Sequence, residues 1–240
     1  MTTDVKSLVN TETGLLDRRI YVDQDIYQME LERVFARSWL FLGHDSLIPN
    51  AHDFFNTYMG EDPVVLTRDS EGKARAFLNV CRHRGNAVCR VDRGNTSSFM
   101  CPYHGWTYSA DTGDLISVPA FNEAYYGELD LKGHGLVRVP HVDSYRGLIF
   151  GNWDPDAPPL LDYLGDMTWY MDMLFGRRDG GTKVLGGVYK WVGKFNWKLA
   201  ADNFAGDAHH LPITHGSAMQ VGVTGRASGP KLQPGFQVTP

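Results

Sequence analysis

The chain has few cysteines, no long apolar run and no long run of basic residues. Only three of its 240 residues are cysteine, at positions 81, 89 and 101, and an odd number argues against a disulfide framework. No stretch approaches the roughly 18 apolar residues of a membrane span, and MTTDVKSLVN at the N-terminus lacks the apolar core of a secretory signal. A net charge of -5 without a basic run argues against nucleic-acid binding. We therefore expect a cytoplasmic protein that binds neither nucleic acid nor a membrane.

A nucleotide-binding fingerprint is also lacking. No G-x-G-x-x-G follows an expected strand, and the glycines at 180, 181, 186 and 187 do not have that spacing. We therefore expect no bound nicotinamide or flavin.

The composition, 42% hydrophobic and 21% charged, is ordinary for a globular chain, and the length suits one large domain or two modest ones.

Two short Cys–His clusters stand out between residues 79 and 108. Cys81-x-His83 and Cys101-x-x-His104 are separated by seventeen residues. A [2Fe–2S] centre with two Cys on one iron and two His on the other needs this set of ligands. A zinc ion also accepts two Cys and two His, but zinc spacings usually leave at least two residues between the partners of a pair. The single residue between Cys81 and His83 favours ligands of two different irons.

The residues around the second cluster suit a redox centre. Pro102 fixes a backbone torsion beside Cys101, and Gly105 lets the chain turn sharply after His104. Trp106 and Tyr108 supply an apolar wall that limits access of solvent. The remaining cysteine, Cys89, is expected to be a small buried thiol in the first loop.

The chain reads as an α+β protein in three parts. Asp23 is a plausible N-cap for an amphipathic helix whose buried stripe is Tyr27, Leu31, Val34 and Phe35. From 39 to 155 short strands alternate with turns, and hairpins are expected over 63–80 and 106–119, with further strands over 136–153. The segment 153–159 has three prolines and is the expected linker. Helix is then expected over 160–174, strand over 184–195 and helix again around Asn196.

A second group of metal-binding residue types lies near the C-terminal end. Asp207 and His210 are at i and i+3, which places them on one face of a helix. Pro212 would end or bend that helix, so that His215 could fold back toward His210. Two imidazoles and one carboxylate with open positions form the facial triad of non-haem Fe(II) oxygenases. By itself the pattern D-x-x-H-x4-H is only moderately specific, and a pair of histidines on a polar helix is the more common explanation of it.

Together the patterns C-x-H-x17-C-x2-H, with CPYHGW as its second half, and NWKLAADNFAGDAHHLPITH resemble the large α subunit of Rieske non-haem iron dioxygenases of the naphthalene and biphenyl type. The resemblance runs from the N-terminal helix to His215. It implies an antiparallel β Rieske domain (39–155) inserted between an N-terminal helical segment (1–38) and the start of an incomplete α+β catalytic domain of the helix-grip type (156–240).

The resemblance also implies roles for individual residues. Cys81, His83, Cys101 and His104 would hold the Rieske cluster, and His210 and His215 would ligate a mononuclear Fe(II). Asp207 would be an electron bridge between a cluster-ligating His of one subunit and an iron-ligating His of its neighbour. Residues expected near the substrate are Asn203, Phe204, Ala208 and Leu211.

His209 rivals His210 as a ligand, but it points about 100° round a helix from it, so we interpret it as a residue of the pocket or one that contacts the ligands. Asp202 stands where many relatives have Glu. The family's third iron ligand is an Asp that lies further along than Pro240, and no carboxylate follows Asp207. We therefore expect the N-terminal half of a longer subunit, whose activity without the remainder is doubtful.

The resemblance implies an oxygenase that adds O₂ to an aromatic hydrocarbon to give a cis-dihydrodiol. Electrons would come from NAD(P)H through a reductase and a ferredoxin, and a small β subunit would complete an α3β3 or α3 assembly. Two alternatives remain open from the residues: a non-catalytic Rieske-type electron carrier and a zinc-stabilised interaction domain.

Overall fold

The structure is a computed structural model that describes residues 4–207 and 210–221. The described residues divide into two compact units. The first unit combines the residues before Asp25 with those from Lys190 onward, and the second runs from Asp25 to Tyr189.

The first unit is mainly helical. Its elements are η1 (Val5–Leu8), the paired strands β1 (Val9–Asn10) and β2 (Leu15–Leu16), α1 (Arg19–Val22), α6 (Trp197–Ala205), α7 (His210–Thr214) and α8 (Gly216–Gln220). Asn196 caps α6, because its side-chain oxygen accepts the backbone N–H of Lys198 at 3.1 Å. The helix expected after Asn196 is thus confirmed.

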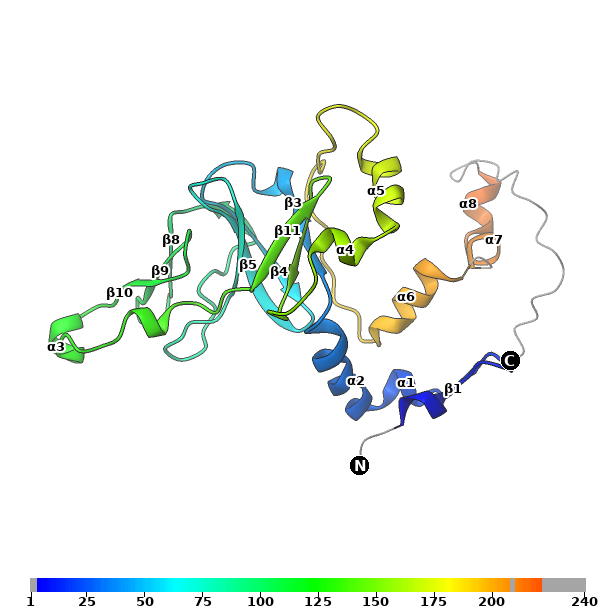
Figure 1. The fold of residues 1–240 in the computed structure, drawn as a ribbon, viewed down its shortest axis with the longest axis horizontal. Coiled ribbons are helices and arrows are strands. Elements are labelled where there is room, and N and C mark those ends of the chain that lie inside the picture. The colour runs from blue at the N-terminus through cyan, green and yellow to red at the C-terminus, as the bar shows by residue number, and fades with distance from the viewer. Residues whose placement is uncertain (1–3, 208–209, 222–240) are drawn as a thin grey trace. The chain divides into compact units, whose positions relative to one another are not determined.

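The second unit holds the larger sheets (Figure 1). Its elements are α2 (Gln24–Glu30), the π-helical turn η2 (Leu31–Phe35), β3 (Leu40–His44), η3 (Asp45–Leu47), β4 (Asp53–Met59), β5 (Asp62–Arg68), β6 (Ala74–Leu78), β7 (Arg93–Asn95), β8 (Ser98–Met100), β9 (Thr107–Ser109), β10 (Leu115–Ser117), α3 (Phe121–Tyr125), η4 (Lys132–His134), β11 (His141–Tyr145), β12 (Leu148–Asn152), α4 (Leu160–Leu164) and α5 (Met167–Phe175). The three antiparallel sheets have the strand orders β6-β5-β4-β7, β10-β9-β8 and β11-β12-β3.

The four-stranded sheet is buried on both faces. Successive side chains of a strand point to opposite faces, and here neighbours enter different hydrophobic clusters. In β5, Val65 joins one cluster while Val64 and Leu66 join the other. The side chains of the neighbouring strands β4 and β6 are divided between the two clusters in the same way, and Phe54 and Phe77 belong to the cluster of Val65. The cluster on that face also contains Cys81, Cys101, Trp106 and Tyr108, so the sheet is a rigid support for both Cys–His loops.

The mixed α+β, antiparallel class expected from the sequence is confirmed, as are the hairpins β5–β6 and β9–β10. The predicted buried face of the N-terminal helix is partly wrong. Ile26 is the buried residue of α2, whereas Val34, which was expected to be buried, is 39% exposed. The strand expected over 184–195 is wrong, since no strand occurs there among the described residues. A strand needs a neighbour for its N–H and C=O groups, and Val192 is 98% exposed. No helix in the described ranges is long and apolar enough to span a bilayer.

Candidate metal sites

The two Cys–His clusters lie on loops that close in the same way. In the first loop the N–H of Cys81 donates to the carbonyl of Asn86 at 2.8 Å, and the N–H of Gly85 donates to the carbonyl of Cys81 at 2.9 Å. The second loop repeats both bonds, from Cys101 to Trp106 at 2.8 Å and from Gly105 to Cys101 at 2.9 Å. Gly85 and Gly105 have φ of +74° and +70°, a conformation that glycine adopts without strain. Each turn therefore presents its Cys and His from a similar frame.

Asn79 holds the first loop onto the end of β6. Its side-chain oxygen accepts the N–H groups of Val88 and Cys89 at 3.0 and 2.9 Å, and its amide donates to the carbonyl of Cys89 at 2.7 Å. The side chain is buried, at 5% exposure, so these bonds are shielded from water. The sequence analysis missed Asn79, although a polar residue directly after an apolar strand was a usable signal.

The two sulfurs are buried and receive hydrogen bonds. Cys81 and Cys101 are 3% and 2% exposed. Tyr108 was expected to be only an apolar wall, but its hydroxyl lies 3.2 Å from Cys81 Sγ and accepts the N–H of Arg82 at 3.1 Å. Burial, followed by this bond to Cys81, raises the pKa of the Tyr108 phenol. The phenol therefore keeps its proton and can donate it to the Cys81 sulfur.

Polar groups also favour the thiolate of Cys101. Burial alone would raise the pKa of this thiol, but the N–H of Tyr103 and the amide of Asn86 act against burial. The Asn86 amide nitrogen lies 3.7 Å from Cys101 Sγ. The net result is a lowered pKa for Cys101. A thiolate is the form that binds metal.

The two imidazoles lie together at the outer side of the loops. The ring centroids of His83 and His104 are 4.6 Å apart. His83 is half-buried and stacks on Trp106 at 5.0 Å with 8° between the planes, while His104 is exposed. Trp106 is fixed in turn, because its Nε1 donates to the hydroxyl of Tyr125 at 3.2 Å. Burial, and then the charges of His104 and Arg84, lower the pKa of His83, which keeps the ring neutral and able to bind metal.

This donor set fits a two-iron cluster. Two buried sulfurs and two imidazoles converge from matched turns, which is the ligand count of a cluster with Cys on one iron and His on the other. His83 Nδ1 is a buried nitrogen that has no hydrogen-bond partner among the described residues, so it is available to a metal. Over the same residues, no three His, Cys, Asp or Glu side chains gather closely enough to hold one metal ion.

The second His pair also meets. The Nε2 atoms of His210 and His215 are 3.0 Å apart, and the ring centroids are 4.8 Å apart. Two imidazole nitrogens that point at one place form two sides of a metal site. Asp207 lies beside them, because its Oδ1 accepts the backbone N–H of His210 at 2.9 Å. The two imidazoles are thus brought together, and the Asp207 carboxylate contacts the backbone of His210.

The local structure differs from the expected one. Asp207 does not share a helix with His210: α6 ends at Ala205, α7 begins at His210, and Asp207 lies between them. Pro212 does not end the helix either, since it lies in the first turn of α7, where a backbone N–H would have no intrahelical partner and the lack of one in proline costs no hydrogen bond. Among the other predicted residues, Ala208 and His209 lie outside the described residues, and of Leu211 only its place in α7 is described.

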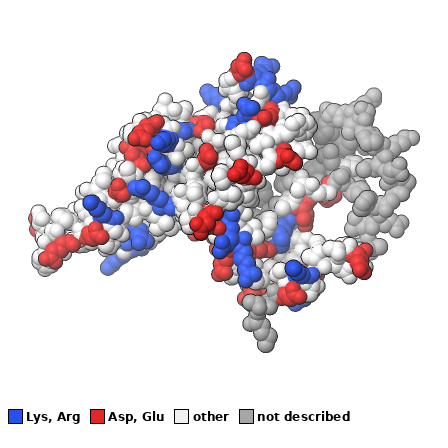
Figure 2. Space-filling view, in the orientation of Figure 1, with Lys and Arg blue, Asp and Glu red and all other residues white. Residues whose placement is uncertain are grey.

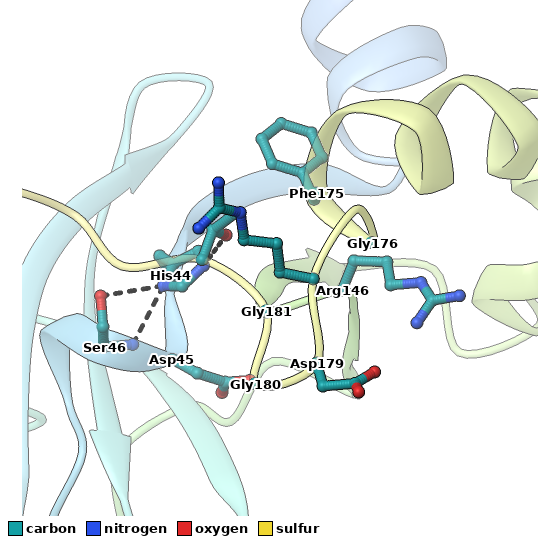
Figure 3. Close-up of a pocket in the computed structure, with 12 residues that line it drawn as sticks. His44, Asp45, Ser46, Arg146, Phe175, Gly176, Asp179, Gly180 and Gly181 are labelled. Carbon is teal, nitrogen blue, oxygen red and sulfur yellow. Dashed lines mark hydrogen bonds between the residues drawn. The ribbon is translucent and has the colours of Figure 1, made fainter.

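One of the expected substrate residues that the structure describes is largely exposed. Phe204 is 84% exposed and Asn203 is half-buried, both in α6. A cleft of about 510 Å³ lies elsewhere, between the end of β3 and the loop after α5 (Figure 3). There the N–H of Ser46 donates to Nδ1 of His44, and Nε2 of the same ring lies 3.1 Å from Thr182 Oγ1. This cleft contains none of the predicted ligands, so it has no part in the metal chemistry considered above.

Comparisons with known proteins agree with the geometry. The family described as "Rieske [2Fe-2S] domain" matches residues 38–144. The α subunit of biphenyl 2,3-dioxygenase from Rhodococcus jostii (strain RHA1) is 49% identical over 211 residues, which are 88% of this chain and 45% of the relative. The α subunit of benzene 1,2-dioxygenase from Pseudomonas putida is 47% identical over 213 residues, 89% of this chain and 47% of the relative.

Solved structures give the same result. The crystal structure of naphthalene 1,2-dioxygenase from Rhodococcus sp. bound to indole matches with a TM-score of 0.82 and 45% identity, over 91% of this chain and 50% of that one. The chain thus spans about half the length of the curated relatives that it matches. The resemblance drawn from the sequence is confirmed.

Proposed function

Because the chain belongs to the Rieske [2Fe-2S] family through residues 38–144 and is related over most of its length to aromatic-ring dioxygenase α subunits, we propose that it works in a terminal oxygenase. The reaction adds O₂ to an aromatic hydrocarbon and gives a cis-dihydrodiol. The observation that carries the proposal is that one chain holds both a Cys₂His₂ loop pair and a His pair whose Nε2 atoms are 3.0 Å apart. An electron carrier needs only the loop pair.

In this proposal the four loop residues Cys81, His83, Cys101 and His104 hold the Rieske cluster, and His210 and His215 hold a mononuclear Fe(II). When bound, these groups supply single electrons and activate O₂. The protein contributes to this chemistry by holding the ligands in place and by stabilising charge on them. Tyr108 donates to Cys81, which favours added negative charge on the sulfurs.

Asp207 has the role of a positioning residue and electron bridge. Its carboxylate accepts the backbone N–H of His210, the residue proposed to bind iron, at 2.9 Å. A carboxylate that accepts an imidazole N–H orients the ring and raises its basicity as a ligand. In the assembled oxygenase Asp207 would span a cluster-ligating His and an iron-ligating His of neighbouring subunits.

The partners follow from the same proposal. A ferredoxin and a reductase deliver electrons from NAD(P)H, and a small β subunit completes an α3β3 or α3 assembly. In this proposal the residues facing the substrate would be Asn203, Phe204, Ala208 and Leu211, a set that suits an apolar arene. The domain division 1–38, 39–155 and 156–240 belongs to this proposal, as does a cytoplasmic location, where reducing conditions keep cysteine ligands as thiols.

Iron and zinc analysis of the purified chain, with EPR of the reduced sample, is the decisive experiment. We expect iron at both sites, no stoichiometric zinc and the signal of a reduced mixed-valence [2Fe–2S] pair. A colourless protein with stoichiometric zinc would overturn the proposal. A cluster without iron at His210 and His215 would also overturn the oxygenase function and would support an electron carrier instead. Supplied reductase, ferredoxin and naphthalene or biphenyl, with mass analysis of the products, then test the reaction.

A further inference from the structure

His44 is the buried histidine of the described part of the chain, with 6% of its surface exposed. It ends β3, and the N–H of Ser46 donates to its Nδ1 at 3.1 Å. A backbone N–H can only donate, so Nδ1 carries no proton and the neutral ring holds its hydrogen on Nε2. Nε2 lies 3.1 Å from Oγ1 of Thr182, which accepts that hydrogen. Both ring nitrogens are therefore committed while the ring is neutral.

These contacts tie down a strap, which we define as residues 177–184 after α5. His44 holds the strap at Thr182, and the N–H of Val184 donates to Oγ of Ser46 at 3.0 Å. Both bonds end at the corner where β3 passes into η3. The strap lines the cleft of about 510 Å³ on one side, and this corner lines it on the other (Figure 3). A loss of the two bonds would therefore widen the cleft.

Little else in the strap resists movement. It contains no helix or strand, and its residues other than Val184 are exposed. Gly180 and Gly181 have φ of +88° and +69°, a region that glycine enters without a steric penalty. Segments with few buried apolar contacts open at a small cost in free energy. The position of the strap therefore depends on its bonds to His44 and Ser46.

A proton from solvent can enter the neutral ring only at Nδ1. The imidazolium then donates from both nitrogens and accepts at neither. The N–H of Ser46 would face another N–H and lose its acceptor, and the Ser46 hydroxyl, 2.9 Å from Nδ1, would have to turn its lone pairs to the ring. That oxygen already accepts the N–H of Val184. Proton uptake by His44 therefore weakens the bonds on which the strap depends.

The hairpin turn between β11 and β12 keeps the ring in place. A Cβ on Gly147 would lie 2.6 Å from Nε2 of His44, so the turn closes directly over the ring. The N–H of Asp45 donates to the carbonyl of Gly147 at 2.8 Å, and His44 pairs with Leu148 in the sheet. The ring is thus held by the sheet, and the strap is the part that can move away.

Charged groups around His44 do not favour the imidazolium. Asp45 of η3 pairs with Arg68 of β5 at 2.6 Å, and Arg146 of the hairpin turn pairs with Asp172 of α5 at 2.6 Å. Each of these carboxylates is thus already neutralised by an arginine. Figure 2 shows groups of both signs at the top of the unit, where the strap lies. The strap has one carboxylate and three basic side chains, Asp179, Arg177, Arg178 and Lys183. A positive His44 therefore repels the strap.

We propose that His44 is a pH-sensitive latch. In its neutral form it holds the strap against the end of β3, and proton uptake releases the strap. The latch is closed at the alkaline end of the range in which histidines change charge, about pH 5 to 8, and it opens as the pH falls through that range. This inference concerns a cleft that contains none of the Cys–His loop residues, and it does not depend on the proposed function.

The test is hydrogen–deuterium exchange of the purified chain at about pH 8 and about pH 5.5, with each rate corrected for the intrinsic effect of pH on amide exchange. The amides of Ser46 and Val184 should exchange about fivefold faster at the lower pH, the factor expected for the loss of one hydrogen bond. Protection should return when the pH is raised again. His44→Asn keeps an oxygen that can accept the Ser46 N–H but cannot titrate, so its corrected exchange should be the same at both pH values.

His141→Asn is the matched control. Nε2 of His141 lies 2.8 Å from the carbonyl oxygen of Pro155, which can only accept, so protonation of this ring keeps its bond. The variant should leave the pH dependence of the strap unchanged. If His44→Asn does not fold, Ser46→Ala takes its place, since it removes the acceptor of the Val184 N–H and should release the strap at both pH values.

Equal corrected exchange of the unmodified chain at the two pH values overturns the latch. A pH dependence that persists in His44→Asn or disappears in His141→Asn also overturns it, as does a strap that stays protected in Ser46→Ala. A loss of protection that does not reverse when the pH is raised would show acid damage instead of a latch.

Discussion

Replacing Tyr108 by phenylalanine removes one hydroxyl group, which contacts the Cys81 sulfur at 3.2 Å. The ring is fully buried, so phenylalanine keeps the packing and only the polar contact is lost. A hydrogen bond to a charged group contributes about 1.5–3 kcal/mol, and it is stronger once an added electron has increased the negative charge on the sulfurs. If the two redox states differ by about 1 kcal/mol, and 59 mV corresponds to a tenfold change or about 1.4 kcal/mol, the potential falls by about 40 mV.

The measurement is a redox titration of the cluster, followed by EPR or by voltammetry. Tyr103→Phe is the control, since Tyr103 is 58% exposed and its hydroxyl makes no hydrogen bond within the described part of the chain. We expect a shift below about 10 mV there. The loss of an acceptor for the N–H of Arg82 should also destabilise Tyr108→Phe by about 1 kcal/mol. A folded Tyr108→Phe protein with an unchanged potential would refute the assignment of the hydroxyl as donor.

Three further predictions follow from the two sites. Gly105→Ala should destabilise the protein by about 2–3 kcal/mol, because the new Cβ would lie 2.7 Å from Pro119 at φ of +70°. Gly85→Ala, with a similar φ but nothing within 4 Å, should lose only about 1–2 kcal/mol, and equal losses in urea unfolding would contradict this reasoning. Asn79→Ala removes three buried hydrogen bonds and should lower the free energy of unfolding by about 3 kcal/mol. A loss of less than about 1 kcal/mol in chemical denaturation would contradict this expectation. Asp207→Ala should retain the cluster signal yet slow single-turnover electron delivery to the mononuclear iron by 10- to 100-fold, and normal delivery would remove the bridging role.

Local patterns carried most of the chemical conclusions. The Cys–His spacing and the identity of the turn residues are properties of short segments, because a loop that closes on itself needs few distant contacts. The positive φ of Gly105 and the Cys101 turn could therefore be anticipated from the sequence around CPYHGW. The same is true of the hairpin β5–β6, whose alternating apolar residues and turn lie within twenty residues.

Long-range contacts had to be seen in the structure. The contact between Tyr108 and Cys81 joins residues that are 27 positions apart. They meet because the sheet β10-β9-β8, which contains Tyr108, shares a hydrophobic cluster with the four-stranded sheet. The prediction of a strand over 184–195 was wrong for a related reason: the residue pattern of a segment shows only that it could pair with another strand. Pairing depends on a neighbour that the described residues do not supply.

By itself, the sequence determined which side chains are candidates for binding iron, since the types and spacing of residues are covalent facts of the chain. Tertiary structure decided the surroundings of those residues: which sulfur contacts a phenol hydroxyl, which imidazole stacks on an indole, and that Asp207 precedes α7 rather than sharing a helix with His210. The physical reason is that hydrogen bonds and stacking act over a few ångströms, and folding alone sets those distances between residues far apart in the chain.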